Sequence, residues 1–533
     1  MDQLNSFQIL LLGLITAVVA FAGLARRFAV SYPIVLVIAG LLCSLIPHLP
    51  RVPLPPDLVF LVFLPPLLFA AAWQTSWREF RFNLVSIAFL AVGLVFFTAI
   101  GVALTAHFFM PGFDWRLGFL LGAIVSPTDA VAATSIARRV GLPQRVVDIL
   151  EGESLLNDAT GLLALQFGVD MILQGSRPSL SHGLLQLLWL LGGGIVIGLL
   201  VGAIVNWAEK WINDGPVEII VSLLVAYGSY LLGEAAHSSG VMSVVACGLY
   251  LSRKSSTFFS PAVRLQAEAV WDALEFLLNG LVFILLGLQL PYVLAGIQGY
   301  SFSRLAFYGL AFSAVLIALR MIWVFPAAQL TYAIRTRWMG QEYPRPTPKL
   351  MFVLGWTGMR GVVALAAAGS LPYVLNDGTT GFPQRNIIVF LTFAVILVTL
   401  VLQGLTLPPL VRALKLSGVD GPMCEEGEAR RILLQSAIQF LQEGKQQDGE
   451  AAHIYDDLLH QYEHRLMDLE DCLPDDPAAR RRLSSMHSVM LQTVRHERRE
   501  LIGLRDSGRI GDTTHRAIER ELDLVESKLY LQG

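Results

Sequence analysis

Long apolar runs separated by short polar loops make up residues 1–415 of this chain. About 17 to 25 apolar residues are needed for one helical crossing of a bilayer. The pattern therefore predicts thirteen spanning helices, at 7–25, 30–49, 55–73, 84–110, 116–137, 146–173, 184–206, 217–236, 238–252, 265–290, 304–334, 349–373 and 386–411. The weakest boundary is the short hinge at His237 to Gly240, and without it the number of crossings would be even.

The composition agrees with a polytopic membrane protein. Hydrophobic residues make up 54% of the chain and charged residues only 15%, whereas about a quarter of a soluble domain is charged. The four cysteines lack CxxC spacing, so neither a disulfide framework nor a zinc site is predicted. No glycine-rich nucleotide loop is apparent, and we expect no enzyme activity, no organic cofactor and no nucleic-acid partner.

Basic residues are distributed unevenly between the two sets of loops. With thirteen crossings, fifteen Lys and Arg residues fall in the short loops on one side and five on the other. Cytoplasmic loops carry the excess of positive charge. This bias predicts an outside N-terminus and a cytoplasmic C-terminal tail, in the inner membrane of a bacterium.

Residues 416–533 differ in character from the rest. They hold 15 basic and 23 acidic residues, with apolar positions at helical spacing among the charges. The pattern predicts amphipathic helices with a break near Leu473 to Pro477. We therefore expect two domains, a transmembrane domain at 1–415 and a cytoplasmic helical domain at 416–533.

Three ionisable residues are predicted to lie deep in the membrane. At 1.5 Å per residue from the cytoplasmic helix end, Asp158 lies about 20 Å deep, Asp129 about 14 Å and Arg360 about 16 Å. The hydrocarbon core is about 30 Å thick, so all three are near its middle. Charges at this depth are expensive and are functional candidates by default.

Two of the predicted helices carry interruptions at the same depth. Pro127 stands beside Asp129, and glycines 355, 358 and 361 surround Arg360. Broken helices in corresponding halves of a chain are typical of transporters with inverted repeats, whose site lies where the half-helices cross. Asp129 would offset the partial positive charge of the half-helix N-termini there. Arg360 or another cation would offset the partial negative charge of the half-helix C-termini.

The oxygen-bearing residues near this crossing suit a small hard cation. Ser154 and Asp158 share one helix face at 100° per residue. Together with Asp129 and Thr128 they offer oxygen ligands without thiol or imidazole groups. Burial disfavours a charged carboxylate, so Asp158 is expected to hold a proton when no cation is bound. Proton and cation would then compete for one group, which is the chemistry of exchange.

Five motifs carry a family resemblance: "FLPPLLF", "SPTDAVAA", "ESLLNDATGLL", "EFLLNGLVFILLGLQL" and "GMRGVVALA". With these motifs in order, residues 7–415 resemble bacterial sodium/proton antiporters of the monovalent cation:proton antiporter superfamily, in the branch of the NhaP-like proteins and the sodium/proton exchangers.

The resemblance implies an all-α homodimer in which a core domain moves against a scaffold domain by an elevator-like alternating access. It implies exchange of Na+, or of K+ or Li+, for H+. The implied residues are Asn157 with Asp158 as the carrier of proton and cation, Asp129, Thr128 and Ser154 as further ligands, and Glu153 with Arg360 as a structural ion pair. Asparagine at 157 leaves one titrating group there, which implies electroneutral one-for-one exchange.

The chain departs from the family pattern at two positions. Relatives with a glutamate after "LPPLLF" have a further ligand where this chain has Ala70, and the frequent "TDP" is here "TDA", with Ala130. Outside the motifs, Arg320 is deep enough to need a partner, and Glu275 is the candidate. Glu151 is expected on a solvated face near the entrance.

Two other functions remain open from the sequence. One is a sodium-coupled symporter of an organic anion on the same architecture. The other is a membrane sensor that signals through its cytoplasmic tail, which predicts that deleting residues 420–533 abolishes function.

Overall fold

The chain forms two helical units. In the computed structural model, the described residues are 2–28, 30–46, 54–110, 112–173, 180–212, 214–258, 261–297, 300–341, 343–375, 380–416, 423–447, 452–471, 477–507, 509 and 512–532. Internal contacts divide the chain into Met1–Val419 and Asp420–Gly533. This division lies four residues from the expected domain boundary. Apart from one isolated bridge between Val374 and Gly381, the regular structure of the described residues is helical.

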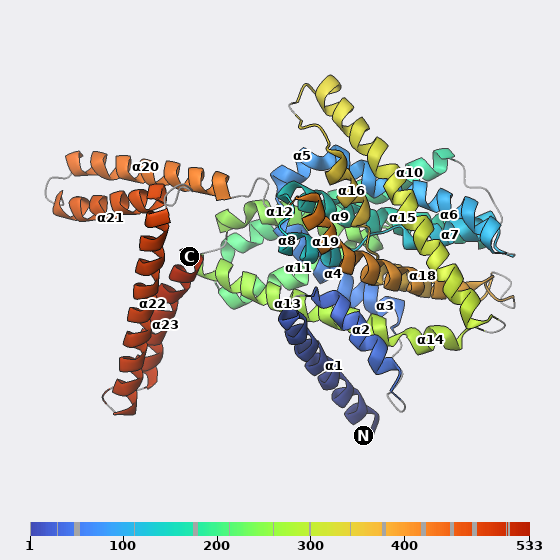
Figure 1. The fold of residues 1–533 in the computed structure, drawn as a ribbon, viewed down its shortest axis with the longest axis horizontal. Helices are drawn as coiled ribbons and strands as arrows, with labels where there is room; N and C mark the ends of the chain where they lie inside the picture. The colour runs from blue at the N-terminus through green and yellow to red at the C-terminus, as the bar shows by residue number, and fades with distance from the viewer. Residues whose placement is uncertain are drawn as a thin grey trace. The chain divides into compact units, whose positions relative to one another are not determined.

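The first unit (Figure 1) contains the helices α1 (Asp2–Arg27), α2 (Tyr32–Ser44), α3 (Pro56–Leu58), α4 (Leu64–Gln74), α5 (Trp77–Ala88), α6 (Val95–Phe109), α7 (Trp115–Val125), α8 (Ala130–Arg139), α9 (Gln144–Leu173), α10 (Leu180–Ala208), α11 (Gly215–Ala235), α12 (Gly240–Phe258), α13 (Pro261–Leu288), α14 (Leu290–Ala295), α15 (Phe302–Ala333), α16 (Pro348–Trp356), α17 (Val362–Gly369), α18 (Arg385–Val398) and α19 (Gly404–Leu414).

Each of the thirteen predicted ranges overlaps a helix or consecutive helices, although 30–49 extends beyond α2, which ends at Ser44. Among the described residues, eight helices are long and apolar enough to cross a membrane, or nine if the bent pair α7–α8 counts as one crossing. The predicted hinge exists, because α11 and α12 are separated by a turn in which His237 has a left-handed φ of 52°. Thirteen crossings and inverted repeats stay predictions.

Short π-helical segments interrupt several long helices, which the hydrophobic pattern did not predict. They are η1 (Val59–Phe63), η2 (Phe89–Leu94), η4 (Ile334–Trp338) and η5 (Thr399–Gln403). Pro65 and Pro66 follow η1 after Leu64, and because they have no backbone N–H they interrupt the regular hydrogen-bond ladder. Single π turns inside α-helices are frequent at functional sites.

Helices α2 and α13 pack with their backbones in close contact. A Cβ atom on Gly40 would lie 3.1 Å from the Cα atom of Gly287. Small residues at such positions let membrane helices approach closely. The pair therefore forms one wall of the membrane unit with little freedom to shift internally.

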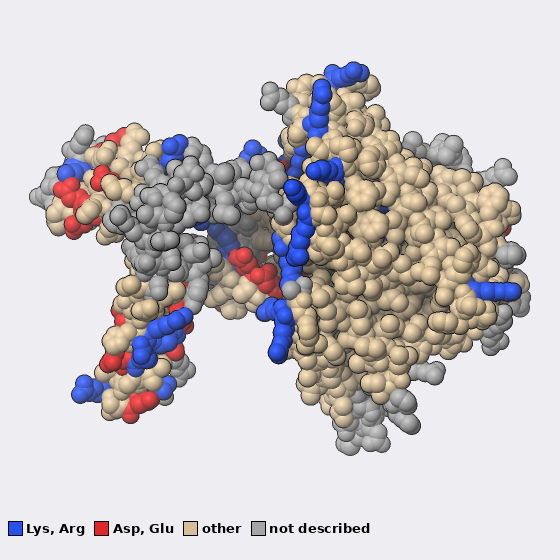
Figure 2. Space-filling view, in the orientation of Figure 1, with Lys and Arg blue, Asp and Glu red and all other residues tan. Residues whose placement is uncertain are grey.

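The surface of the membrane unit has the pattern of a protein in a bilayer. Figure 2 shows a broad face without charged residues, and most of the visible Lys and Arg residues of this unit lie along one edge of that face. Large apolar side chains such as Trp189, Leu200 and Ile204 on α10 are more than half exposed. Contact with lipid, rather than packing in a buried core, explains why these large apolar side chains are exposed.

The second unit consists of α20 (Met423–Gln447), α21 (Ala452–Asp471), α22 (Pro477–Asp506) and α23 (Asp512–Gln532). Helices α20 and α21 pack against each other, as do α22 and α23. Arg498 joins the second pair through Asp523 at 2.8 Å and Glu526 at 2.6 Å. The predicted break falls between α21 and α22, but residues 472–476 lie outside the described residues.

Candidate functional site

The two predicted helix breaks meet each other. Helices α7 and α8 are bent by 45° at their break, and α16 and α17 are separated by Thr357 to Gly361. The backbone N–H of Asp129 in the first break donates to the carbonyl oxygen of Met359 in the second, at 2.9 Å. A Cβ atom on Gly361 would lie only 2.7 Å from Oδ2 of Asp129. The crossing therefore depends on a glycine at 361.

Asp129 caps the half-helix α8. Its Oδ1 accepts a hydrogen bond from the N–H of Val131 at 2.9 Å, and the N–H of Ala130 donates to Oγ of Ser154 at 3.2 Å. A carboxylate at a helix N-terminus is stabilised by the free N–H groups and by the helix dipole. This is the position that the sequence predicted for Asp129.

Asn157 and Glu153 hold Thr128 in place. Asn157 donates from Nδ2 to Oγ1 of Thr128 at 2.7 Å, and that hydroxyl donates to Oε1 of Glu153 at 3.1 Å. All three side chains are buried. The hydroxyl therefore has one lone pair left for a further contact.

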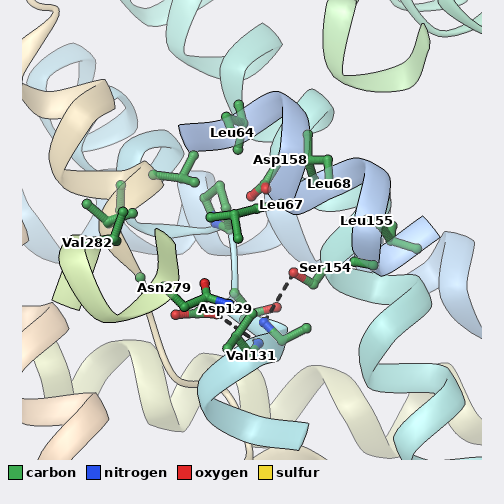
Figure 3. Close-up of a pocket in the computed structure, with 18 of the residues that line it drawn as sticks. Leu64, Leu67, Leu68, Asp129, Val131, Ser154, Leu155, Asp158, Asn279 and Val282 are labelled. Atoms are coloured by element: carbon green, nitrogen blue, oxygen red, sulfur yellow. Dashed lines mark hydrogen bonds between the residues drawn. The ribbon is translucent and has the colours of Figure 1, made fainter. Parts of the chain in front are cut away.

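A cavity of about 100 Å³ lies at the crossing (Figure 3). Its lining combines residues of the α7–α8 break and α9 with apolar residues of α4, α13 and α17. The polar lining residues are Thr128, Asp129, Glu151, Ser154, Asp158 and Asn279, and no Lys, Arg or His lines the cavity in the described part of the chain. Negative potential and oxygen ligands make this a site for a cation.

Asp158 is the acid left free in this cavity. Its side chain is 6% exposed, and no hydrogen bond or ion pair engages its carboxylate within the described ranges. It lies close enough to Asp129 for the two carboxylates to interact electrostatically. Its uncommitted oxygens are available to a proton or a cation.

The predicted pairing of Glu153 with Arg360 stays a prediction: Arg360 lies near Glu153, but the direct ion pair of Glu153 is with another arginine. Glu153 instead pairs with Arg320 of α15, which contacts Oε1 through Nη1 and Oε2 through Nη2, the latter at 2.9 Å. Both side chains are 1% exposed. Arg320 also donates from Nε and Nη2 to the carbonyl oxygen of Leu354, so it satisfies the C-terminal end of α16.

The glycine at 358 explains this arrangement. A Cβ atom there would lie 2.8 Å from Nε of Arg320, so only glycine leaves room for the guanidinium to reach Glu153. Arg360 lies near this pair without joining it, and its backbone N–H donates to Oγ1 of Thr399 at 3.2 Å. Its side chain is 1% exposed, and its Nε and Nη1 have no hydrogen-bond partner.

The remaining sequence candidates are distributed around the site. Glu275, the partner suggested for Arg320, instead accepts a hydrogen bond from Nε2 of Gln74 at 3.0 Å. Glu151 lines the cavity and pairs with Arg138 at 2.6 Å. Ala70 is 3% exposed but is not among the lining residues, whereas Ala71 is.

Sequence reasoning missed the cavity position of Asn279 and the partner of Arg320. For Arg320 a signal was present, because an arginine in the middle of a 32-residue apolar helix needs a deep acid. For Asn279 the signal was weaker, because an amide in an apolar helix has many possible partners.

The sequence and the fold each match known proteins. The sequence model described as "Sodium/hydrogen exchanger, transmembrane" matches residues 13–413. An uncharacterized Na+/H+ exchanger of Mycobacterium tuberculosis is 34% identical over 98% of this chain and 96% of its own. The sodium, potassium, lithium and rubidium/H+ antiporter of Bacillus subtilis is 29% identical over 96% of this chain and 76% of its own.

Among solved structures, the sodium proton antiporter MjNhaP1 of Methanocaldococcus jannaschii has a similar fold. The TM-score is 0.58 at 20% identity, and the match covers 79% of this chain and 100% of that one. With a family match over most of its length, this chain belongs to the sodium/hydrogen exchanger family, whose members are transporters rather than enzymes.

Proposed function

We propose that this protein exchanges a monovalent alkali cation, most simply Na+, for H+ at the cavity where the broken helices cross. Asp158 carries the proton or the cation, and Asp129, Ser154 and Thr128 contribute further oxygens. The observation that carries this proposal is a small cavity lined by the buried Asp158 and the partly buried Asp129, with no basic lining residue in the described part of the chain. The names of the relatives support alkali cations as the substrates.

The buried charges favour one-for-one exchange. Arg320 and Glu153 cancel each other as an ion pair. The charges that remain in the sum are then the positive charge of Arg360 and the carboxyl groups of Asp129 and Asp158. The sum is zero when one aspartate holds a proton, and also when both are ionised around one monovalent cation. Because both loaded forms have the same charge, a cycle that swaps one for the other moves no net charge.

An elevator-like movement agrees with the way the cavity is built. Its acids lie on the α7–α8 break and α9, whereas α4 and α13 contribute mostly apolar side chains. A smooth apolar wall would let the acid-bearing helices slide past it. We further propose a homodimer in a bacterial inner membrane with the tail in the cytoplasm, as the basic-loop bias predicts.

The test is the variant Asp158→Asn in proteoliposomes with a trapped pH dye. Addition of Na+ should release protons from vesicles with the wild-type protein and not from vesicles with the variant, because an amide neither binds a proton in this range nor carries charge. Asp170→Asn is the matched control, since Asp170 is an exposed acid on the same helix α9. Exchange at the wild-type rate by Asp158→Asn would overturn the assignment.

The symporter alternative is less favoured by the same cavity. An organic anion needs positive partners, and the described lining has three acids and no base. Uptake of labelled organic anions that depends on Na+ would favour the symporter.

A further inference from the structure

Almost all the polar groups of the cavity come from the α7–α8 break and α9. Thr128 and Asp129 lie in the break, and Glu151, Ser154 and Asp158 lie on α9. On the other side, α4 presents leucines and Ala71, and α13 presents Val282 and Phe283. Within the described residues, Asn279 is the one polar side chain that α4 or α13 brings to the cavity (Figure 3).

Asn279 is buried without a partner for its amide nitrogen. The side chain is 3% exposed, and Nδ2 makes no hydrogen bond. A buried donor without an acceptor lowers the stability of the fold, so the amide at this position requires an explanation. A side-chain amide can turn either Oδ1 toward a cation or Nδ2 toward a carboxylate. Asn279 therefore suits a cavity that alternates between a cation and ionisable acids.

Several other oxygens around the cavity are already engaged. Oγ of Ser154 accepts from the N–H of Ala130, and Oδ1 of Asp129 accepts from the N–H of Val131. The hydroxyl of Thr128 accepts from Asn157 and donates to Glu153. A dehydrated alkali cation needs several oxygens around it. The lone pairs that remain on these oxygens, together with Asp158, supply part of the shell, and the amide oxygen of Asn279 is a lining group that can complete it.

The position of Asn279 is fixed by the α2–α13 pair. The hydroxyl of Tyr32 on α2 lies next to Asn279, and its ring packs on Phe276 with centroids 5.7 Å apart. The close backbone contact at Gly40 and Gly287 holds the same two helices together further along. A ligand on a rigid support loses little entropy on binding and discriminates between ions by size.

We propose that Asn279 is a cation ligand from the α13 side of the cavity and that it sets the affinity for the alkali ion and the preference between alkali ions. This inference rests on the proposed exchange function. Asn279 and Asp158 lie on different helices. Movement of α9 against α13 therefore carries the cation bound at Asp158 away from Asn279. The cation is therefore held more weakly after that movement.

The experiment measures the Na+ dependence of exchange and of thermal stability for the full chain in proteoliposomes and in detergent. Asn279→Leu keeps the side-chain size and removes the oxygen. It should raise the half-saturating Na+ concentration about tenfold, the effect of about 1.4 kcal/mol, and leave the maximal rate within about twofold. The Na+ concentration that raises the melting temperature should shift by the same factor. The ratio of half-saturating K+ to Na+ should also change.

Asn83→Leu is the matched control. Asn83 is also buried, is 0% exposed and has an unpartnered amide oxygen, but it does not line the cavity. This variant should keep the wild-type Na+ dependence. Asn279→Asp should keep or lower the half-saturating concentration, because it retains an oxygen and adds a charge.

An unchanged Na+ dependence in Asn279→Leu would overturn the inference, as would an equal shift in Asn83→Leu. If Asn279→Leu does not fold, Asn279→Asp decides, and a tenfold weaker Na+ dependence there would overturn the inference. Failure of the proposed function gives a different result, because the wild-type protein itself would then show no Na+-driven proton movement.

Discussion

Arg320 and Arg360 are both buried at the centre of the membrane unit, but their surroundings differ. Arg320 has Glu153 and the carbonyl oxygen of Leu354 as partners. Arg360 has two guanidinium nitrogens without hydrogen bonds and lies near Arg320 and Glu153. At this scale Arg320 forms the buried ion pair, and Arg360 is a second buried positive charge near the same glutamate.

Replacing Arg320 should destabilise the protein strongly. Arg320→Ala leaves Glu153 buried without its counter-ion, and breaking a buried pair in this way costs about 3–5 kcal/mol. We expect a large fall in the melting temperature in detergent and little monodisperse protein. Arg360→Ala should have the smaller effect, since no ion pair is lost.

The double variant Arg320→Ala with Glu153→Gln tests the cause. It should recover part of the stability, because the uncompensated charge is gone. If Arg360→Ala were the more destabilising of the two single variants, the ion-pair assignment would be wrong.

At the scale of elements, the site depends on how the two broken helices touch. The hydrogen bond from Asp129 to Met359 joins their backbones, and Gly361 allows the close approach. Local sequence predicted the breaks themselves through Pro127 and the glycines around Arg360. Their mutual contact is a property of the packing.

Gly361→Ala should reduce exchange about tenfold or more. The added methyl group would lie 2.7 Å from Oδ2 of Asp129 and must displace the carboxylate or the backbone, and overpacking of this kind costs about 1–3 kcal/mol. The measurement is dye-reported exchange per amount of folded protein. Gly228→Ala on α11 is the control, because a Cβ atom there meets nothing within 4 Å. Equal rates for Gly361→Ala and Gly228→Ala would contradict the assigned crossing geometry.

At the scale of the whole molecule, the chain divides into a membrane unit and a helical tail unit, each with its own internal contacts. All the residues assigned to the site lie in the first unit. The tail helices pack in pairs with ion pairs of their own, such as Lys445 with Asp456 at 2.5 Å and Arg498 with Asp523.

Deletion of residues 420–533 should leave Na+/H+ exchange in proteoliposomes within a few fold of the full chain, because the cavity's lining residues, as far as the chain is described, all belong to the first unit. The sensor hypothesis predicts the opposite. A truncated protein that is monodisperse in detergent and inactive in vesicles would favour a tail that is required for function.

The sequence by itself determined the helical segments, the two breaks and the deep acids. These features depend on local signals, namely hydropathy, proline and glycine, and distance along one helix. Asp129 and Asp158 could be assigned to one cavity because both were counted to near the middle of the membrane, on predicted helices that a short loop connects.

Only the tertiary structure decided the partner of Glu153 and the ligand role we propose for Asn279. Glu153 and Arg320 are 167 residues apart, and Gly358 on a third segment makes their contact possible. Depth alone did not separate Arg320 from Arg360, because both lie near the middle of apolar segments, Arg320 within α15 and Arg360 in the break between α16 and α17. Which of two buried charges forms the ion pair depends on how three helices pack, and hydropathy along one helix carries no information about that packing.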